Sequence, residues 1–138
     1  MNNEQNWVGK RVLVVEDSEI MRDEIAALYN SLGIEVVAQA KNGVEALEKI
    51  EAQKPDFVSM DIIMPEMHGI DCCRIVHKKY PEIPVLFLSC LTSAPVMQKA
   101  FEAEFPLKNF VEKPPKKEIL QECMSNLFAQ RDAESKQA

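Results

Sequence analysis

The sequence predicts an α/β protein in which a parallel β-sheet is covered by helices on both faces. Short continuous apolar runs, such as Val12 to Val15, are typical of strands that are buried on both sides. These runs alternate five times with stretches whose apolar residues recur at helical spacing, which favours parallel strands joined by crossover helices. A length of 138 residues, 46% of them hydrophobic, is enough for one domain with its own core.

Each predicted element has a local reason in the sequence. The strands are short and largely apolar, at residues 12–15, 34–38, 57–60, 84–88 and 109–111. The helices carry apolar residues at helical spacing, at residues 18–32, 42–54, 70–80, 94–104 and 119–128. Ser18 and Asn42 are suitable N-caps for the first two helices, and Gly33 and Pro55 end them.

The ends of the chain are polar. We expect residues 1–10 to be a flexible lead-in and residues 131–138 a flexible tail, around a single domain over residues 11–130.

The composition excludes several classes of protein. Lysine and arginine total 16 against 22 aspartates and glutamates, and the net charge of −6 argues against a broad nucleic-acid-binding face. No apolar run approaches the roughly 20 residues of a membrane span, and the N-terminus lacks the order of a secretory signal. We therefore expect a cytoplasmic protein with no membrane insertion, no nucleic-acid partner and no room for a DNA-binding domain.

The four cysteines are Cys72, Cys73, Cys90 and Cys123. They have neither CxxC spacing nor the pattern of a disulfide framework, so we expect small buried hydrophobic side chains.

Polar side chains follow four of the predicted strands. Glu16 and Asp17 follow the first, Asp61 the third, Ser89 the fourth and Lys113 the fifth. In a doubly wound sheet the carboxyl ends of the strands meet at one edge, so these groups are expected to share a small pocket. Singly, each has a structural explanation: a helix-dipole charge, a turn former, a solvated loop lysine. The occurrence of all of them at strand ends, however, indicates a functional site.

Three carboxylates in one pocket repel one another unless a cation lies between them. Mg²⁺ suits such oxygen ligands, and one carboxylate can then attack a phosphoryl group. The metal, Lys113 and the Ser89 hydroxyl would hold the phosphoryl oxygens as charge spreads over them.

Four segments, VLVVEDS, DIIMPEMHG, PVLFLS and FVEKP, resemble the receiver domain of two-component response regulators. The match runs in order from about Arg11 to Phe128, and D-x-x-M-P-x-M-x-G occurs whole from Asp61 to Gly69. The resemblance implies a flavodoxin-like, doubly wound, five-stranded parallel sheet in the order 2-1-3-4-5 with five helices. It also implies a stand-alone receiver similar in layout to the chemotaxis receiver, a protein that exemplifies this sheet order.

The resemblance also implies roles for the site residues. Asp61 would accept a phosphoryl group from a histidine kinase or a histidine phosphotransfer protein. Glu16 and Asp17 would hold Mg²⁺ together with Asp61 and the backbone carbonyl of Ile63. Lys113 would pair with the phosphoryl group.

The same resemblance implies how the signal is passed on. Ser89 would be the switch hydroxyl, Phe110 would be the aromatic switch residue, and the Lys113–Pro114 bond would be cis. The protein would act on an unidentified downstream protein through a surface of the fourth helix, fifth strand and fifth helix. It would be a switch and not an enzyme, because it catalyses only its own phosphorylation and dephosphorylation.

Three departures from the family pattern bear on these expectations. The acidic pair is Glu-Asp, where Asp-Asp is common. Cys90 replaces a smaller residue after the switch hydroxyl and narrows access to Asp61, and AEFPLKN replaces the Gly-Ala turn before the fifth strand. The apolar Ile63 and Leu91 cannot position a water by hydrogen bonding, which predicts a long-lived phosphoryl group.

Three other functions are compatible with parts of the pattern. The first is a degenerate receiver that binds proteins without phosphorylation. The second is an aspartyl phosphohydrolase, for which the chain lacks a second acid at Ile63 and a substrate cap. The third is a flavin-binding protein, for which EDSEIM is too acidic to be the phosphate loop.

The downstream partner is open among a flagellar motor component, a relay phosphotransferase and a separate effector enzyme. We expect a monomer or a weak dimer. The last helix would form the dimer through Leu120, Cys123, Met124 and Leu127, unless these residues face the sheet.

Overall fold

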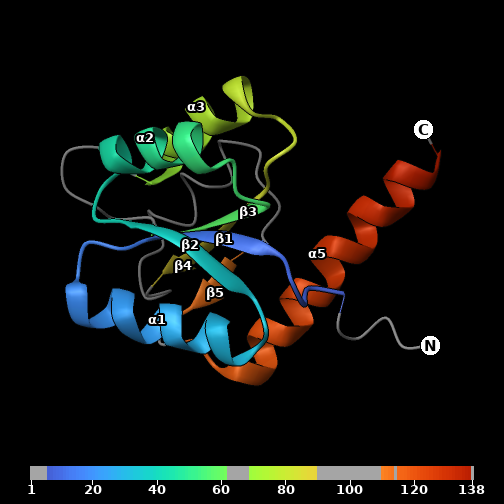
Figure 1. The fold of residues 1–138 in the computed structure, drawn as a ribbon, viewed down its shortest axis with the longest axis horizontal. Coiled ribbons are helices and arrows are strands. Elements are labelled where there is room, and N and C mark those ends of the chain that lie inside the picture. The colour runs from blue at the N-terminus through green and yellow to red at the C-terminus, as the bar shows by residue number, and fades with distance from the viewer. Residues whose placement is uncertain (1–5, 62–68, 90–109, 114, 138) are drawn as a thin grey trace.

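A computed structural model describes residues 6–61, 69–89, 110–113 and 115–137. One five-stranded sheet has the order β2-β1-β3-β4-β5, and every neighbouring pair is parallel. The predicted α/β class, strand number and strand order are therefore confirmed. Figure 1 shows α2 and α3 on one face of this sheet and α1 and α5 on the other.

The strands lie close to the predicted positions. They are β1 (Arg11–Val15), β2 (Glu35–Ala40), β3 (Phe57–Asp61), β4 (Val85–Ser89) and β5 (Phe110–Glu112). In the described residues the helices are α1 (Glu19–Ser31), α2 (Gly43–Gln53), α3 (Gly69–Lys79) and α5 (Lys117–Gln137). The fourth helix predicted at residues 94–104 lies outside the described residues.

Two short-range features set the starts of α1 and α2. The Ser18 Oγ accepts a 3.3 Å hydrogen bond from the amide of Met21, and the Asn42 Oδ1 accepts a 2.8 Å bond from the amide of Glu45. Both side chains are the predicted N-caps, and each satisfies an amide that has no partner inside its helix. Gly33 ends the turn after α1 with a φ of +85°, a conformation that favours glycine.

The core consists of two layers, because side chains in a strand point alternately to the two faces. Leu13 and Val15 of β1 pack with α2 and α3, whereas Val12 and Val14 pack with α1 and α5. The α2–α3 layer contains Cys72 and Cys73, which are buried free thiols as predicted. Burial raises the pKa of each to about 12, so both stay protonated and unreactive at neutral pH.

The α1–α5 layer receives the apolar side of α5. Leu120, Met124 and Leu127 are buried there, and Cys123 packs against the same cluster. These residues face the sheet, so they do not offer an exposed dimer surface.

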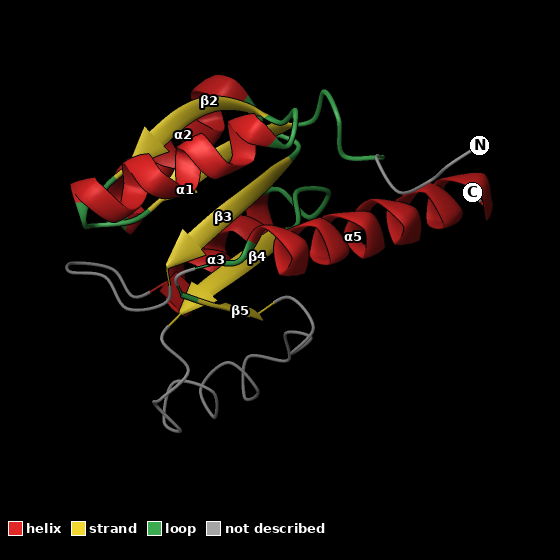
Figure 2. Cartoon of the chain, turned by 90° about the horizontal axis from the view of Figure 1, so that it is seen from below, coloured by secondary structure: helices red, strands yellow, loops and turns green. Residues whose placement is uncertain are grey.

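Two observations bear on the ends of the chain. Within the lead-in, Trp7 is buried and its Nε1 donates a 2.9 Å hydrogen bond to the carbonyl of Leu32. At the other end, α5 stays helical through Gln137, where a flexible tail was predicted from residue 131. Figure 2 shows α5 extending past the end of the sheet where the strands begin.

We call that end of the sheet the amino edge, and the end where Val15, Asp61 and Ser89 lie the carboxyl edge. None of the helices in the described part of the chain is long and apolar enough to span a membrane.

Candidate functional site

Three acidic side chains meet at the carboxyl edge, as predicted. Glu16 and Asp17 follow β1, and Asp61 is the last residue of β3, the strand beside it. One carboxylate oxygen of each lies within 4.8 Å of the others. The parallel pairing of β1 with β3 brings these distant parts of the sequence together, because both strands end at the same edge.

Lys113 completes the cluster from the far side of the sheet. It follows β5, and its Nζ lies 2.8 Å from Oε1 of Glu16 and 3.3 Å from Oδ1 of Asp61. Glu16 and Asp61 are 2% and 6% exposed, whereas Asp17 is exposed. One ammonium therefore serves two buried carboxylates, and a third carboxylate lies at the rim.

Burial and charge shift the pKa values of two of these groups. Burial raises the pKa of the Glu16 carboxyl above 4.5, and the negative charge of Asp61 adds to this, although the hydrogen bond from Lys113 opposes it. Burial lowers the pKa of Lys113, but its bonds to Glu16 and the charge of Asp61 outweigh burial and raise it above 10.5. Lys113 is therefore fully charged at neutral pH.

Glu16 is held by hydrogen bonds with three further neighbours, two through its backbone and one through its side chain. Its amide donates a 3.0 Å hydrogen bond to the carbonyl of Ala40, and its Oε2 accepts a 3.3 Å bond from the amide of Ser18. Its carbonyl accepts a 2.9 Å bond from Nη1 of Arg22. The sequence interpretation missed Arg22, because a contact to a backbone carbonyl six residues away leaves no pattern in the residue types.

The remaining predicted residues are placed only in part. Ser89 ends β4, which lies next to β3, and Phe110 begins β5 on the other side of β4. Their backbones therefore lie at or near the carboxyl edge. Ile63, Cys90, Leu91 and Pro114 lie outside the described residues.

The donor set fits a hard divalent cation. All three groups are carboxylates, and oxygen ligands are those that Mg²⁺ takes in proteins. With all groups ionised, three negative charges face one ammonium, and a divalent cation would cancel the excess. Glu16, Asp17 and Asp61 are thus the residues that would hold Mg²⁺.

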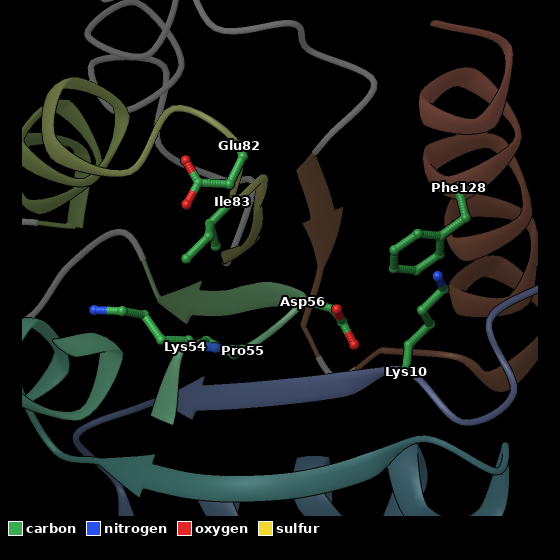
Figure 3. A pocket seen from close by; sticks show the side chains of 7 residues that line it. All are labelled: Lys10, Lys54, Pro55, Asp56, Glu82, Ile83 and Phe128. Carbon is green, nitrogen blue, oxygen red and sulfur yellow. The ribbon is translucent and has the colours of Figure 1, made fainter. Parts of the chain in front are cut away.

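A shallow pocket of about 320 Å³ lies at the opposite, amino edge. Figure 3 shows its lining side chains, Lys10, Lys54, Pro55, Asp56, Glu82, Ile83 and Phe128. Its charged groups are of both signs and lie largely in solvent, so we assign it no ligand.

The family model for the response regulator receiver domain matches residues 12–125. This chain belongs to the response regulator receiver family. It is therefore a receiver domain of two-component signalling, and the acidic cluster at its carboxyl edge is consistent with Mg²⁺ binding.

Two relatives illustrate the similarity. The chemotaxis protein CheY of Thermotoga maritima is 39% identical over 107 residues, 78% of this chain and 88% of that protein. A protein-glutamate methylesterase/protein-glutamine glutaminase of Pyrococcus abyssi is 39% identical over 105 residues, 75% of this chain. The match covers only 28% of that longer protein.

Among solved structures, the signal receiver domain of a modulated diguanylate cyclase from Desulfovibrio desulfuricans superposes with a TM-score of 0.81 at 20% identity. The alignment covers 91% of this chain and 98% of that one, and it supports the fold.

Proposed function

We propose that this chain is a response regulator that accepts a phosphoryl group on Asp61, with Mg²⁺ held by Glu16, Asp17 and Asp61. The donor would be the phosphohistidine of a histidine kinase or of a histidine phosphotransfer protein. One observation carries the proposal: three carboxylates have oxygens within 4.8 Å of one another, and Lys113 bonds two of them. A cluster that served only stability would balance its charges, whereas this one gathers acids in excess.

Asp61 is the nucleophile in this proposal. One of its carboxylate oxygens forms the new O–P bond while the P–N bond of the phosphohistidine breaks, and the imidazole nitrogen keeps the electron pair. When bound, Mg²⁺ supplies positive charge that offsets the phosphoryl oxygens and the crowded acids. The backbone carbonyl of Ile63 is its proposed further ligand.

Lys113 is the chain's own cation at the reacting group. Its Nζ already lies 3.3 Å from Oδ1 of Asp61, so it is placed to donate a hydrogen bond to a phosphoryl oxygen carried by that carboxylate. Its bond to Glu16 holds the long side chain in position before the phosphoryl group arrives.

Ser89 and Phe110 are the proposed switch residues. The strands that carry them flank each other beside Asp61, which supports the idea that new oxygens on Asp61 draw the Ser89 hydroxyl inward. Phe110 then turns to fill the vacated space, and the surface around β5 and α5 changes for an unidentified downstream protein.

Several finer points belong to the same proposal. The receiver spans residues 11–130 and acts as a switch, not as an enzyme with an external substrate. The apolar Ile63 and Leu91 give the phosphoryl group a long lifetime, and the protein is a monomer or a weak dimer.

The test is the intact mass of the protein after incubation with acetyl phosphate and Mg²⁺. We expect one phosphoryl adduct on the wild type, none on Asp61→Ala, and a normal adduct on Asp23→Ala, which removes an exposed aspartate of α1. An absent adduct on the wild type, when a known receiver is labelled in parallel, would reject the proposal in favour of a degenerate binding module.

A further inference from the structure

Arg22 connects the acid-bearing loop to the end of β2, and the chemistry above does not use it. It lies in the first turn of α1 and is half-buried. Its Nη1 donates a 2.9 Å hydrogen bond to the carbonyl of Glu16, and its Nε donates a 3.2 Å bond to Oε1 of Gln39. One guanidinium therefore joins α1, β2 and the loop after β1.

The carbonyl that Arg22 holds belongs to the peptide bond between Glu16 and Asp17. That peptide is planar, so fixing the carbonyl also fixes the amide of Asp17 and the direction in which the chain enters Asp17. On the other side of Glu16, the amide is already held by the carbonyl of Ala40. Arg22 therefore supplies the anchor on the side that leads to Asp17.

Asp17 depends on its backbone more than the other two acids do. Its side chain is exposed, and across the described ranges no hydrogen bond or ion pair holds its carboxylate. Glu16 and Asp61, in contrast, are buried and bonded to Lys113. An exposed side chain on a loose backbone spreads its oxygens over many positions, and ordering them costs conformational entropy when a ligand binds.

We propose that Arg22 is a positioning residue for the cation site: it holds the Glu16–Asp17 peptide so that the Asp17 carboxylate already points at Glu16 and Asp61. This role rests on the proposed function, since it matters only if the site binds Mg²⁺. Arginine suits it because the N–H donors of the planar guanidinium reach two acceptors on different elements at once.

A role through charge alone predicts the opposite result. A guanidinium near an acidic site repels a cation, so its removal would raise the affinity for Mg²⁺. A positioning role predicts that removal of the Arg22 side chain lowers the affinity for Mg²⁺ about tenfold. This is the low end of the range for residues that orient metal ligands without contacting the metal.

The experiment is calorimetric titration of the full chain with Mg²⁺. We expect Arg22→Met to weaken binding about tenfold and Arg22→Lys, which keeps the charge but has a single donor nitrogen, to weaken it about threefold. Gln39→Met removes one acceptor but leaves the charge of Arg22 in place, and it is also expected to weaken binding. The matched control is Arg74→Met, which removes an arginine whose ion pair with Asp71 is exposed on α3, and it should bind as the wild type does.

If Arg22 and Gln39 act together, the effects of their substitutions on Mg²⁺ affinity are not additive. The double variant Arg22→Met/Gln39→Met should therefore bind no more weakly than Arg22→Met alone. Unchanged or tighter binding by Arg22→Met overturns the proposal. If Arg22→Met does not fold, the proposal is tested with Arg22→Lys and Gln39→Met. Wild-type affinity for Mg²⁺ in both of these variants overturns the proposal.

The outcomes separate this proposal from the proposed function. A wild type that binds Mg²⁺ but takes no phosphoryl group rejects the function, while the order of Mg²⁺ affinities still decides the role of Arg22. A wild type that is phosphorylated, with equal Mg²⁺ affinity in every variant, rejects the role of Arg22 alone. A wild type that binds no Mg²⁺ rejects both.

Discussion

The two edges of the sheet carry the same kinds of charged side chain and use them differently. At the amino edge, Nη1 of Arg11 donates 2.9 and 3.0 Å hydrogen bonds to the carbonyls of Gln53 and Lys54, where α2 ends. There a cation meets the negative end of a helix, and both lie in solvent. At the carboxyl edge, Lys113 is enclosed with two buried acids, and a third acid lies beside them.

The difference shows that the candidate site is distinguished by the burial and close spacing of its charged side chains, and not by their residue types. Exposed charges of both signs keep their contact with water, so they cost little free energy on folding and contribute little to stability. Buried acids in excess of their cations destabilise the fold, and a protein retains them where the site needs a ligand to complete it. The predictions below test this contrast.

The largest effect is expected at the amino edge, from an apolar residue. Trp7→Ala should lower the free energy of unfolding by about 3–5 kcal/mol, because Trp7 is 5% exposed and bonded to the carbonyl of Leu32. Urea unfolding measures this, and Mg²⁺ affinity should not change. A decrease in the free energy of unfolding of less than about 1 kcal/mol would indicate that residues 1–10 are a flexible lead-in.

Mg²⁺ should stabilise the protein through the carboxyl edge. At about 100 times its dissociation constant, a ligand that binds only the folded state adds about 2.7 kcal/mol. Asp17→Asn should remove most of this gain yet leave the metal-free stability unchanged, since Asp17 is exposed. Urea unfolding with Mg²⁺ and with EDTA measures both values, and a full gain in the variant would remove Asp17 from the ligand set.

Lys113→Met should destabilise the fold, because it removes the positive charge from the acidic cluster at the carboxyl edge. It leaves the carboxylates of Glu16 and Asp61 without their ammonium, and we expect a loss of about 1–3 kcal/mol in EDTA. Mg²⁺ should restore part of the loss, because it supplies the missing positive charge. The control at the amino edge is Lys54→Met, whose ammonium is exposed and should leave the urea midpoint nearly unchanged.

The smallest effect concerns pH at the amino edge. The hydroxyl of Tyr80 donates a hydrogen bond to Glu51, and this bond, with the charge of Lys54, lowers the pKa of Glu51 below 4.5. Stability from this carboxylate is therefore present above pH 4.5 and is lost as the pH falls through the lowered folded-state pKa.

Glu51→Gln should accordingly make the melting temperature less sensitive to pH below 4.5 than it is in the wild type. Equal slopes for the two proteins would show that this bond does not form in solution. Glu48→Gln, an exposed change on the same helix, is the control.

Most of the fold was predictable because apolar runs and helix caps are local signals. Val12 to Val15 and the caps Ser18 and Asn42 lie where the sequence predicts them. The strand order was not contained in these signals and came from the family resemblance. The three acids and Lys113 were predictable as a set, because each follows a strand and parallel strands end at one edge.

The misses have a physical pattern. Trp7 was overlooked because the two apolar residues Trp7 and Val8 in a polar segment are too few to show a periodicity. The length of α5 was not predictable because RDAESKQ lacks an apolar face, although alanine, glutamate, lysine and arginine all favour helix. Arg22 was missed because its partners are a backbone carbonyl and Gln39, which only the folded chain brings near it.

The bond between Lys113 and Glu16 joins residues that are 97 positions apart. During synthesis, at about 5–20 residues per second, roughly 5–20 s pass between the appearance of the acid and that of its cation. Glu16 is without its lysine throughout that interval, and Asp61 is without it from its own synthesis until Lys113 is added. The pocket thus cannot be completed before β5 and Lys113 have been synthesised, and a chain released before Lys113 would hold the acids without the charge that holds them together.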